Sequence, residues 1–157
     1  MQKIEFGALG DLIFQPWLVT LGTLRKDGTI LLSPMWFEWD GEAFVISTSE
    51  GGANIRNVRR NPIVTLSIAE EQTFPGRGLE VVGHAEIQPD HGLQGLTRIS
   101  NKYLGPEVGA QWREARRNRE WLVMRVVPER VRAYDHRDEP MLVDAKPSLS
   151  SPQPSSK

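Results

Sequence analysis

The chain contains no cysteine among its 157 residues. Disulfides, thiolate metal sites, iron–sulfur clusters and cysteine nucleophiles are therefore excluded, and the composition suits a cytoplasmic protein. No apolar run approaches the roughly 20 residues that cross a bilayer, and the opening MQKIEFGALGDLIF lacks the pattern of a signal peptide. The formal net charge is only -1. We therefore expect a cytoplasmic protein whose partner is neither a nucleic acid nor an anionic membrane.

The side-chain patterns of common catalytic sites are also missing. His84, His91 and His136 do not lie at metal-ligand spacing from one another or from a carboxylate pair, so we expect no metal. The chain has no GxSxG, HExxH or P-loop motif. No catalytic side chain can be assigned from the sequence. If the protein is an enzyme, a cofactor carries the chemistry.

What the chain does contain is the pattern of a small β-protein with 39% hydrophobic and 25% charged residues. Alternating apolar positions and turn residues predict strands over 17–24, 30–39, 42–49, 63–69, 79–88 and 121–127, the last continuing at 130–134. Helices are expected over 53–60 and, with a break at Gly105-Pro106, over 90–118. Because antiparallel hairpins dominate, this order favours a small barrel with helices packed outside it. We expect one domain over 1–137 and a disordered, Pro- and Ser-rich tail over 138–157.

The strand predicted over 30–39 is apolar on both faces. One face carries Ile30, Leu32 and Trp36, and the other carries Leu31, Met35, Phe37 and Trp39. Such a strand is covered by the core on one side and by a ligand, a helix or a partner subunit on the other. Pro34 cannot donate a ladder hydrogen bond, so a bulge or a strand edge is expected there.

The segment STSEGGANIRNVRRNP, residues 47–62, combines strand-end hydroxyls, a glycine pair and the start of an arginine-bearing helix. These features together suit a phosphate group. The alternative is that the arginines form a solvated helix face and that the hydroxyls merely end a strand. Glu50 favours this alternative, because a carboxylate at a helix N-terminus competes with a phosphate.

Three segments, LVTLGTLRKDGTILLSPMWFEWDG, FVISTSEGGANIRNVRRNP and LEVVGHAEI, carry a resemblance that covers about residues 15–135. Their ordered motifs resemble the pyridoxamine 5'-phosphate oxidase-like split β-barrel superfamily. The match is closest to its actinobacterial branch of flavin/deazaflavin-dependent oxidoreductases, many of which use coenzyme F420. The resemblance implies a mainly β fold, a six-stranded antiparallel split β-barrel of the FMN-binding type. It also implies a homodimer with two cofactor sites in grooves between the subunits.

The resemblance further implies which residues bind the cofactor. The phosphate is expected at Ser47, Thr48, Ser49, Arg56, Asn57 and Arg60, and the ring along Ser33, Pro34, Met35 and Trp36. Lys102, Tyr103 and Trp112 are candidates for the side of the groove that the partner subunit closes. Relatives often carry a phosphate-binding lysine where this chain has Asn54, whose amide can hydrogen-bond but supplies no charge. Arg56 or Arg60 would then replace it, or the cofactor differs in charge, or binding has been lost.

The leading functional prediction is an oxidoreductase that transfers hydride from F420 or FMN to a small unsaturated or carbonyl substrate. F420 is narrowly favoured, because the branch resemblance points to it. The alternative is a non-catalytic carrier of flavin, F420 or haem with the same fold. Oxidation of pyridoxamine phosphate is not expected, because the substrate-phosphate residues of the true oxidases are missing. Nucleic-acid binding through the arginines of 113–119 is a third, weaker hypothesis that the overall charge opposes.

Overall fold

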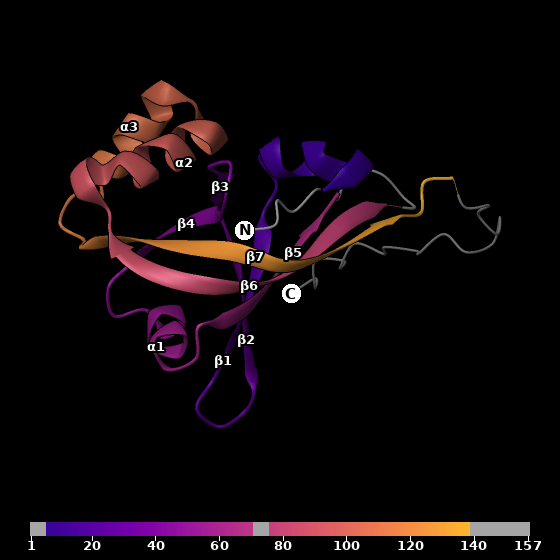
Figure 1. The fold of residues 1–157 in the computed structure, drawn as a ribbon. Helices are drawn as coiled ribbons and strands as arrows, with labels where there is room; N and C mark the ends of the chain where they lie inside the picture. The colour runs from indigo at the N-terminus through magenta and orange to yellow at the C-terminus, as the bar shows by residue number, and fades with distance from the viewer. Residues whose placement is uncertain (1–5, 71–75, 139–157) are drawn as a thin grey trace, which may run out of the picture.

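The computed structural model describes residues 6–70 and 76–138 (Figure 1). The predicted disordered tail therefore lies, from residue 139 onward, outside the described residues. In chain order the elements are η1 (Gly7–Phe14), β1 (Val19–Leu24), β2 (Ile30–Met35), β3 (Phe37–Trp39), β4 (Phe44–Ser49), α1 (Ala53–Arg60), β5 (Ile63–Ala69), β6 (Arg77–Pro89), η2 (His91–Leu93), α2 (Gln94–Leu104), α3 (Pro106–Glu114) and β7 (Trp121–Asp135). None of these helices is both long enough and apolar enough to cross a membrane.

The strands form one curled antiparallel sheet in the order β2-β1-β5-β6-β7-β4-β3, which confirms the predicted mainly β, split-barrel fold. β2 and β3 lie at the two edges of this sheet although only Trp36 separates them in sequence. The sequence predicts one strand over 30–39, whereas the structure divides it because β2 pairs with β1 and β3 pairs with β4. This division gives seven strands in the described residues instead of the expected six. The chain therefore passes from one edge of the curled sheet to the other at Trp36.

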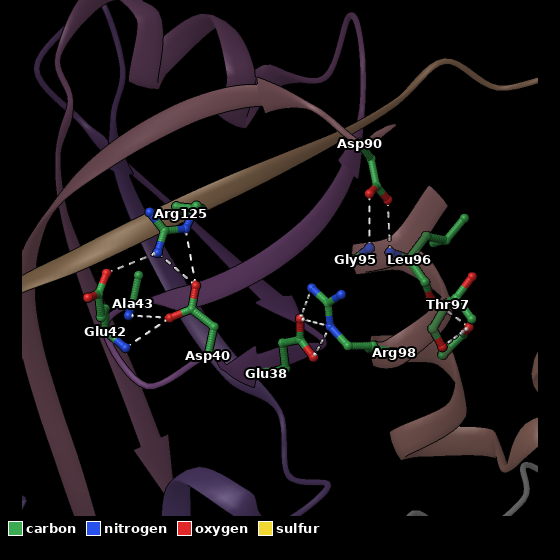
Figure 2. Close-up of polar contacts among 11 residues, drawn as sticks. Glu38, Asp40, Glu42, Ala43, Asp90, Gly95, Leu96, Thr97, Arg98 and Arg125 are labelled. Atoms are coloured by element: carbon green, nitrogen blue, oxygen red, sulfur yellow. Dashed lines mark hydrogen bonds and ion pairs between the residues drawn. The ribbon is translucent and has the colours of Figure 1, made fainter. Parts of the chain in front are cut away.

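Two Asp-Gly turns set the register of the hairpins, as the sequence predicts. Asp27 Oδ1 accepts a hydrogen bond from the Thr29 N–H at 3.0 Å, in the turn that joins β1 to β2. In the turn between β3 and β4, Asp40 Oδ1 accepts from the Ala43 N–H at 2.8 Å. Asp40 also pairs with Arg125 of β7 at 2.8 Å, which attaches this turn to the neighbouring strand (Figure 2).

β7 is one strand that runs through Pro128, where the sequence predicts a strand and a continuation. Pro128 is tolerated because the register of β6 against β7 shifts between Val82 and Gly83, and Gly83 pairs with the proline. Such a bulge accommodates the missing N–H of proline and bends the strand. The two long strands thus curl the sheet around the core.

The core lies inside the curl of the sheet. The largest fully buried side chains include Leu12, Leu21, Phe37, Phe44, Ile46, Leu66, Ile68, Leu79 and Met124. α1 adds Ile55 and Val58, the two residues that its apolar spacing predicts to be buried. Figure 1 shows α1 on one side of the sheet and the pair α2 and α3 on the other, where β4 ends and β7 begins.

α2 is held over the end of the sheet by polar contacts and by close packing (Figure 2). The Asp90 carboxylate accepts hydrogen bonds from the N–H groups of Gly95 and Leu96, both at 2.9 Å. Arg98 pairs with Glu38 of β3 at 2.7 Å. At Gly95 a Cβ atom would lie 2.6 Å from a methyl group of Val123, so only glycine allows this approach to β7. The helix is thereby fixed where it closes one side of a cavity.

Candidate ligand-binding cavity

A cavity of about 330 Å³ lies where the chain passes from β2 to β3, beside the end of β4. Its remaining wall comes from α2, α3 and the start of β7. The lining residues are Pro34, Met35, Trp36, Ser47, Thr48, Ser49, Leu96, Ile99, Trp112, Arg119 and Trp121. The volume falls within the range of small-molecule sites, and the lining combines apolar walls with a few polar groups, as such sites do.

Two segments that the sequence analysis assigns to a cofactor meet in this cavity. Residues 34–36 carry the expected ring-binding side chains, and residues 47–49 carry the expected phosphate-binding hydroxyls. Trp112, a candidate for the partner's side of the groove, lines the cavity of its own chain. Sequence reasoning missed Arg119 and Trp121, because arginines after a helix and a tryptophan at a strand start both have ordinary structural explanations.

Trp36, Trp112 and Trp121 form an aromatic wall of the cavity, and Tyr103, which does not line it, packs behind Trp36. The Trp36 and Tyr103 rings are stacked with centroids 5.0 Å apart and an interplanar angle of 8°. Trp36 also contacts Trp112 at 5.2 Å, and Trp112 contacts Trp121 at 5.8 Å. The Arg116 guanidinium lies 4.3 Å from the Trp112 ring centroid, in a cation–π contact that orients that ring. Such a wall suits a planar conjugated ligand.

Ser47 supplies a buried hydroxyl that has no hydrogen-bond partner among the protein atoms described. Leaving a buried hydroxyl unpaired costs about 1–3 kcal/mol, so native structures rarely do so without a reason. Because Ser47 lines the cavity, a rotation of its side chain would bring this hydroxyl within reach of a ligand there. Within the same described ranges, no group of three or more His, Asp or Glu side chains could hold a metal ion.

A hydrogen-bonded network occupies other residues that the resemblance assigns to the phosphate. The Asn54 side chain donates to Ser33 Oγ at 3.1 Å and accepts from Thr23 Oγ1 at 3.0 Å. Asn57 donates to the same Thr23 oxygen at 3.0 Å. Arg60 donates to Asn57 Oδ1 at 3.0 Å and to a backbone carbonyl of β1 at 2.8 Å. This network joins α1 to β1 and β2, and none of its members lines the cavity.

The other two arginines of α1 are also engaged within the protein. Arg56 donates to the Gly51 carbonyl at 2.5 Å. Arg59 forms a two-bond pair with Glu50, at 2.6 and 2.8 Å, and this hydrogen bonding lowers the pKa of the Glu50 carboxyl. The predicted phosphate site is thus divided: the hydroxyls of 47–49 line the cavity, whereas Asn54, Arg56, Asn57 and Arg60 do not.

Lys102 and Tyr103 attach α2 to the barrel. The Lys102 ammonium donates to the Phe37 carbonyl at 3.0 Å and lies 3.9 Å from the Phe37 ring centroid. The Tyr103 hydroxyl donates to the Trp17 carbonyl at 2.7 Å and accepts from the Phe37 N–H at 3.2 Å. Lys102, predicted to contact the cofactor, therefore binds backbone of its own chain and does not line the cavity.

The burial of Lys102 predicts a pH dependence of stability. Burial lowers the pKa of Lys102 to about 8 from its ordinary 10.5, although Glu38 acts in the opposite direction. Between these values the unfolded chain binds more protons than the folded chain, so this group makes stability rise as pH increases. Burial also raises the pKa of Tyr103 to about 12 from 10.0, which has the opposite effect only above pH 10.

Denaturant unfolding between about pH 7.5 and 9 isolates the lysine, because the tyrosine is almost fully protonated in both states there. We expect the denaturant concentration at the unfolding midpoint to rise with pH over this range. The rise should be larger for the wild-type protein than for Lys102→Met, which cannot titrate at this position. Parallel pH profiles for the two proteins would contradict the assigned pKa.

Comparison with known proteins agrees with this architecture. A conserved hypothetical protein from Mycobacterium tuberculosis is 25% identical, with a TM-score of 0.71 over 85% of this chain and 86% of its own. An F420 reductase is 27% identical, with a TM-score of 0.67 over 82% of this chain and 98% of its own. The haem storage protein of Vibrio cholerae shares the fold at 16% identity, with a TM-score of 0.62 over 86% and 95% of the two chains.

Among curated proteins, none matches this chain. A family model does: the one described as pyridoxamine 5'-phosphate oxidase matches residues 8–135, from η1 to the last residue of β7. This range includes the whole sheet and every residue that lines the cavity. The motif order seen in the sequence and the split sheet seen in the structure thus have one explanation: the chain belongs to the pyridoxamine 5'-phosphate oxidase family.

Proposed function

We propose that the cavity holds the ring system of a flavin-type cofactor and that the protein is an oxidoreductase acting on a small unsaturated or carbonyl substrate. The observation that carries this proposal is the meeting of residues 34–36 with residues 47–49 in one aromatic-walled cavity. Family membership supports it, because the matching family model spans both of these segments.

The residues present fit the ring of such a cofactor better than they fit its phosphate at α1. Trp36, Trp112 and Trp121 offer flat apolar surfaces that orient a ring and exclude water from it. The unpaired Ser47 hydroxyl offers a hydrogen bond. When bound, a flavin-type cofactor would supply hydride transfer, and the side chains of the chain would supply position and shielding. F420 is favoured over FMN, because an F420 reductase is 27% identical to this chain over most of its length.

A carrier without catalytic activity is the second candidate. No His, Cys, Tyr, Lys, Asp or Glu lines the cavity, so its described walls offer no proton donor that titrates near neutral pH. The haem storage protein of Vibrio cholerae shows that a protein with this fold can serve storage. Binding without turnover would favour this reading.

Titration of the purified protein with FMN and, separately, with F420 tests the proposal through the absorbance spectrum of each cofactor. We expect saturable binding of at least one, with F420 the tighter. Steady-state oxidation of the reduced cofactor by a panel of enones, quinones and aldehydes then separates the enzyme from the carrier. If neither cofactor binds, the proposed function is wrong.

We further propose that the protein is a homodimer formed through the outer face of β2. Ile30 and Leu32 expose 58% and 66% of their surface, and Ile63 of β5, on the same face of the sheet, exposes 45%. The sequence predicts that this face is covered, and within the described residues no element covers it. A second copy is the favoured occupant, because the exposed strip continues to Pro34 at the cavity.

Replacing Leu32 by lysine is expected to give a folded monomer. The side chain is mostly exposed in the single chain, so the charge affects association far more than folding. Light scattering should give twice the 17.7 kDa chain mass for the wild type and the single mass for Leu32→Lys. Phe14→Lys, on η1 and equally exposed at 66%, is the control and should stay dimeric. A monomeric wild type would disprove the proposed dimer.

A further inference from the structure

Among the residues that the structure describes, Arg119 is the only charged one that lines the cavity. It is exposed, and in the described ranges 6–70 and 76–138 its guanidinium has no hydrogen-bond or ion-pair partner. A free guanidinium beside apolar walls is a strong binding group for a planar anion, because it can donate two parallel hydrogen bonds. The cavity thus combines a surface that selects flat rings with one group that selects negative charge.

The neighbouring arginines are all engaged elsewhere. Arg113 donates to Ser100 Oγ at 2.6 Å and to Asn101 Oδ1 at 2.9 Å. Arg116 lies over the Trp112 ring and donates to the Trp112 carbonyl at 3.2 Å. Arg117 pairs with Glu114 at the surface. The three arginines of α1 are bound to a carbonyl, a carboxylate and the Asn57 network, as described above. Arg119 therefore differs from the others in being both free and at the cavity.

We propose that Arg119 binds the anionic group of a planar aromatic ligand whose rings lie against Trp36, Trp112 and Trp121. This assigns the anion to the segment that precedes β7, not to α1. At α1 an anion would compete with hydrogen bonds that the arginines already make within the folded chain, whereas the Arg119 guanidinium makes none. Binding at Arg119 exchanges only water for the anion.

The anion has two sources with the same chemistry: the phosphate of the cofactor or the carboxylate of an aromatic substrate. The first source rests on the proposed function, whereas the cavity's preference for an aromatic anion does not. The experiment therefore uses a pair of probes for each source. 2-Naphthoate and 2-naphthamide have the same rings and differ in charge. FMN and riboflavin differ in the phosphate.

Isothermal titration calorimetry measures the dissociation constants of the four probes for three full-length proteins: wild type, Arg119→Gln and Arg117→Gln. The two variants lose the same charge two residues apart, and Arg117 lies outside the cavity. Charge-assisted hydrogen bonds are worth a factor of about 10–100 in affinity. We expect wild type and Arg117→Gln to bind one anionic probe at least about 10-fold more tightly than its neutral analogue, and Arg119→Gln to lose that preference.

Each outcome decides a separate question. A preference for naphthoate that disappears in Arg119→Gln supports a substrate carboxylate, and a preference for FMN over riboflavin that disappears supports the cofactor phosphate. If the wild type prefers neither anion, or if both variants lose the preference equally, the proposal is overturned. Failure of FMN and riboflavin to bind, with naphthoate still dependent on Arg119, would reject FMN as the cofactor but keep the anion site. Thermal unfolding of both variants confirms that they are folded.

Discussion

Gly83→Ala is expected to lower the free energy of unfolding by about 1–3 kcal/mol, because it over-packs the contact between the two longest strands. An added Cβ would lie 2.6 Å from the Val127 carbonyl oxygen and 2.8 Å from a methyl group of Val126. The oxygen belongs to the backbone of β7, so the strand itself must move. Each kcal/mol lowers the Tm of a chain of this size by about 2–4 °C, which calorimetry or circular dichroism resolves.

Gly10→Ala is the matched control. A Cβ at Gly10 would make only an ordinary contact, 3.6 Å from Phe6 Cβ. We expect a Tm within about 2 °C of the wild type for this variant, as for most substitutions without a steric conflict. If Gly83→Ala melts with the control, β6 and β7 are not as close at the bulge as the structure places them. The glycine of the LEVVGHAEI segment would then need another explanation.

Most of the strands can be predicted from the sequence, but the division of one strand into two cannot. Alternation of apolar residues and the two Asp-Gly turns predict most strands and both hairpins, because these signals are local. The break at Trp36 is not local. The run from Ile30 to Trp39 is suited to a strand throughout, and only pairing with two different neighbours divides it. Pro34 signals an irregularity nearby but does not say that the sheet splits there.

The residues that line the cavity can also be predicted only in part from the sequence. Motif order places residues 34–36 and 47–49 at a cofactor, and the fold brings them together. Arg119 and Trp121 carry no sequence signal, because a cluster of arginines after a helix is usually a solvated surface. Their position depends on where α3 ends relative to β7. The network of Asn54, Asn57 and Thr23 is equally hidden, since nothing in the spacing shows that these polar groups bind one another.

The residue at which the sheet splits should therefore matter to both stability and ligand binding. Trp36→Ala removes the stacked contact with Tyr103 and the contact with Trp112, and it enlarges the cavity. We expect a loss of about 3 kcal/mol in the free energy of unfolding, at the lower end for tryptophan because the ring is only partly buried. The affinity for FMN, or for 2-naphthoate, should fall at least about 10-fold, because aromatic stacking contributes directly to binding.

Trp39→Ala separates the two effects. Trp39 is also partly buried and contacts two rings, Phe6 and Phe44, both at 4.9 Å, but it does not line the cavity. This variant should lose a similar amount of stability and keep the wild-type affinity. Trp36→Phe retains an aromatic face toward Tyr103. It should therefore keep most of the stability and most of the ligand affinity that Trp36→Ala loses. Equal affinities for Trp36→Ala and Trp39→Ala, measured where each is fully folded, would mean that the ligand lies elsewhere. The residue that divides the sheet would then have a structural role alone.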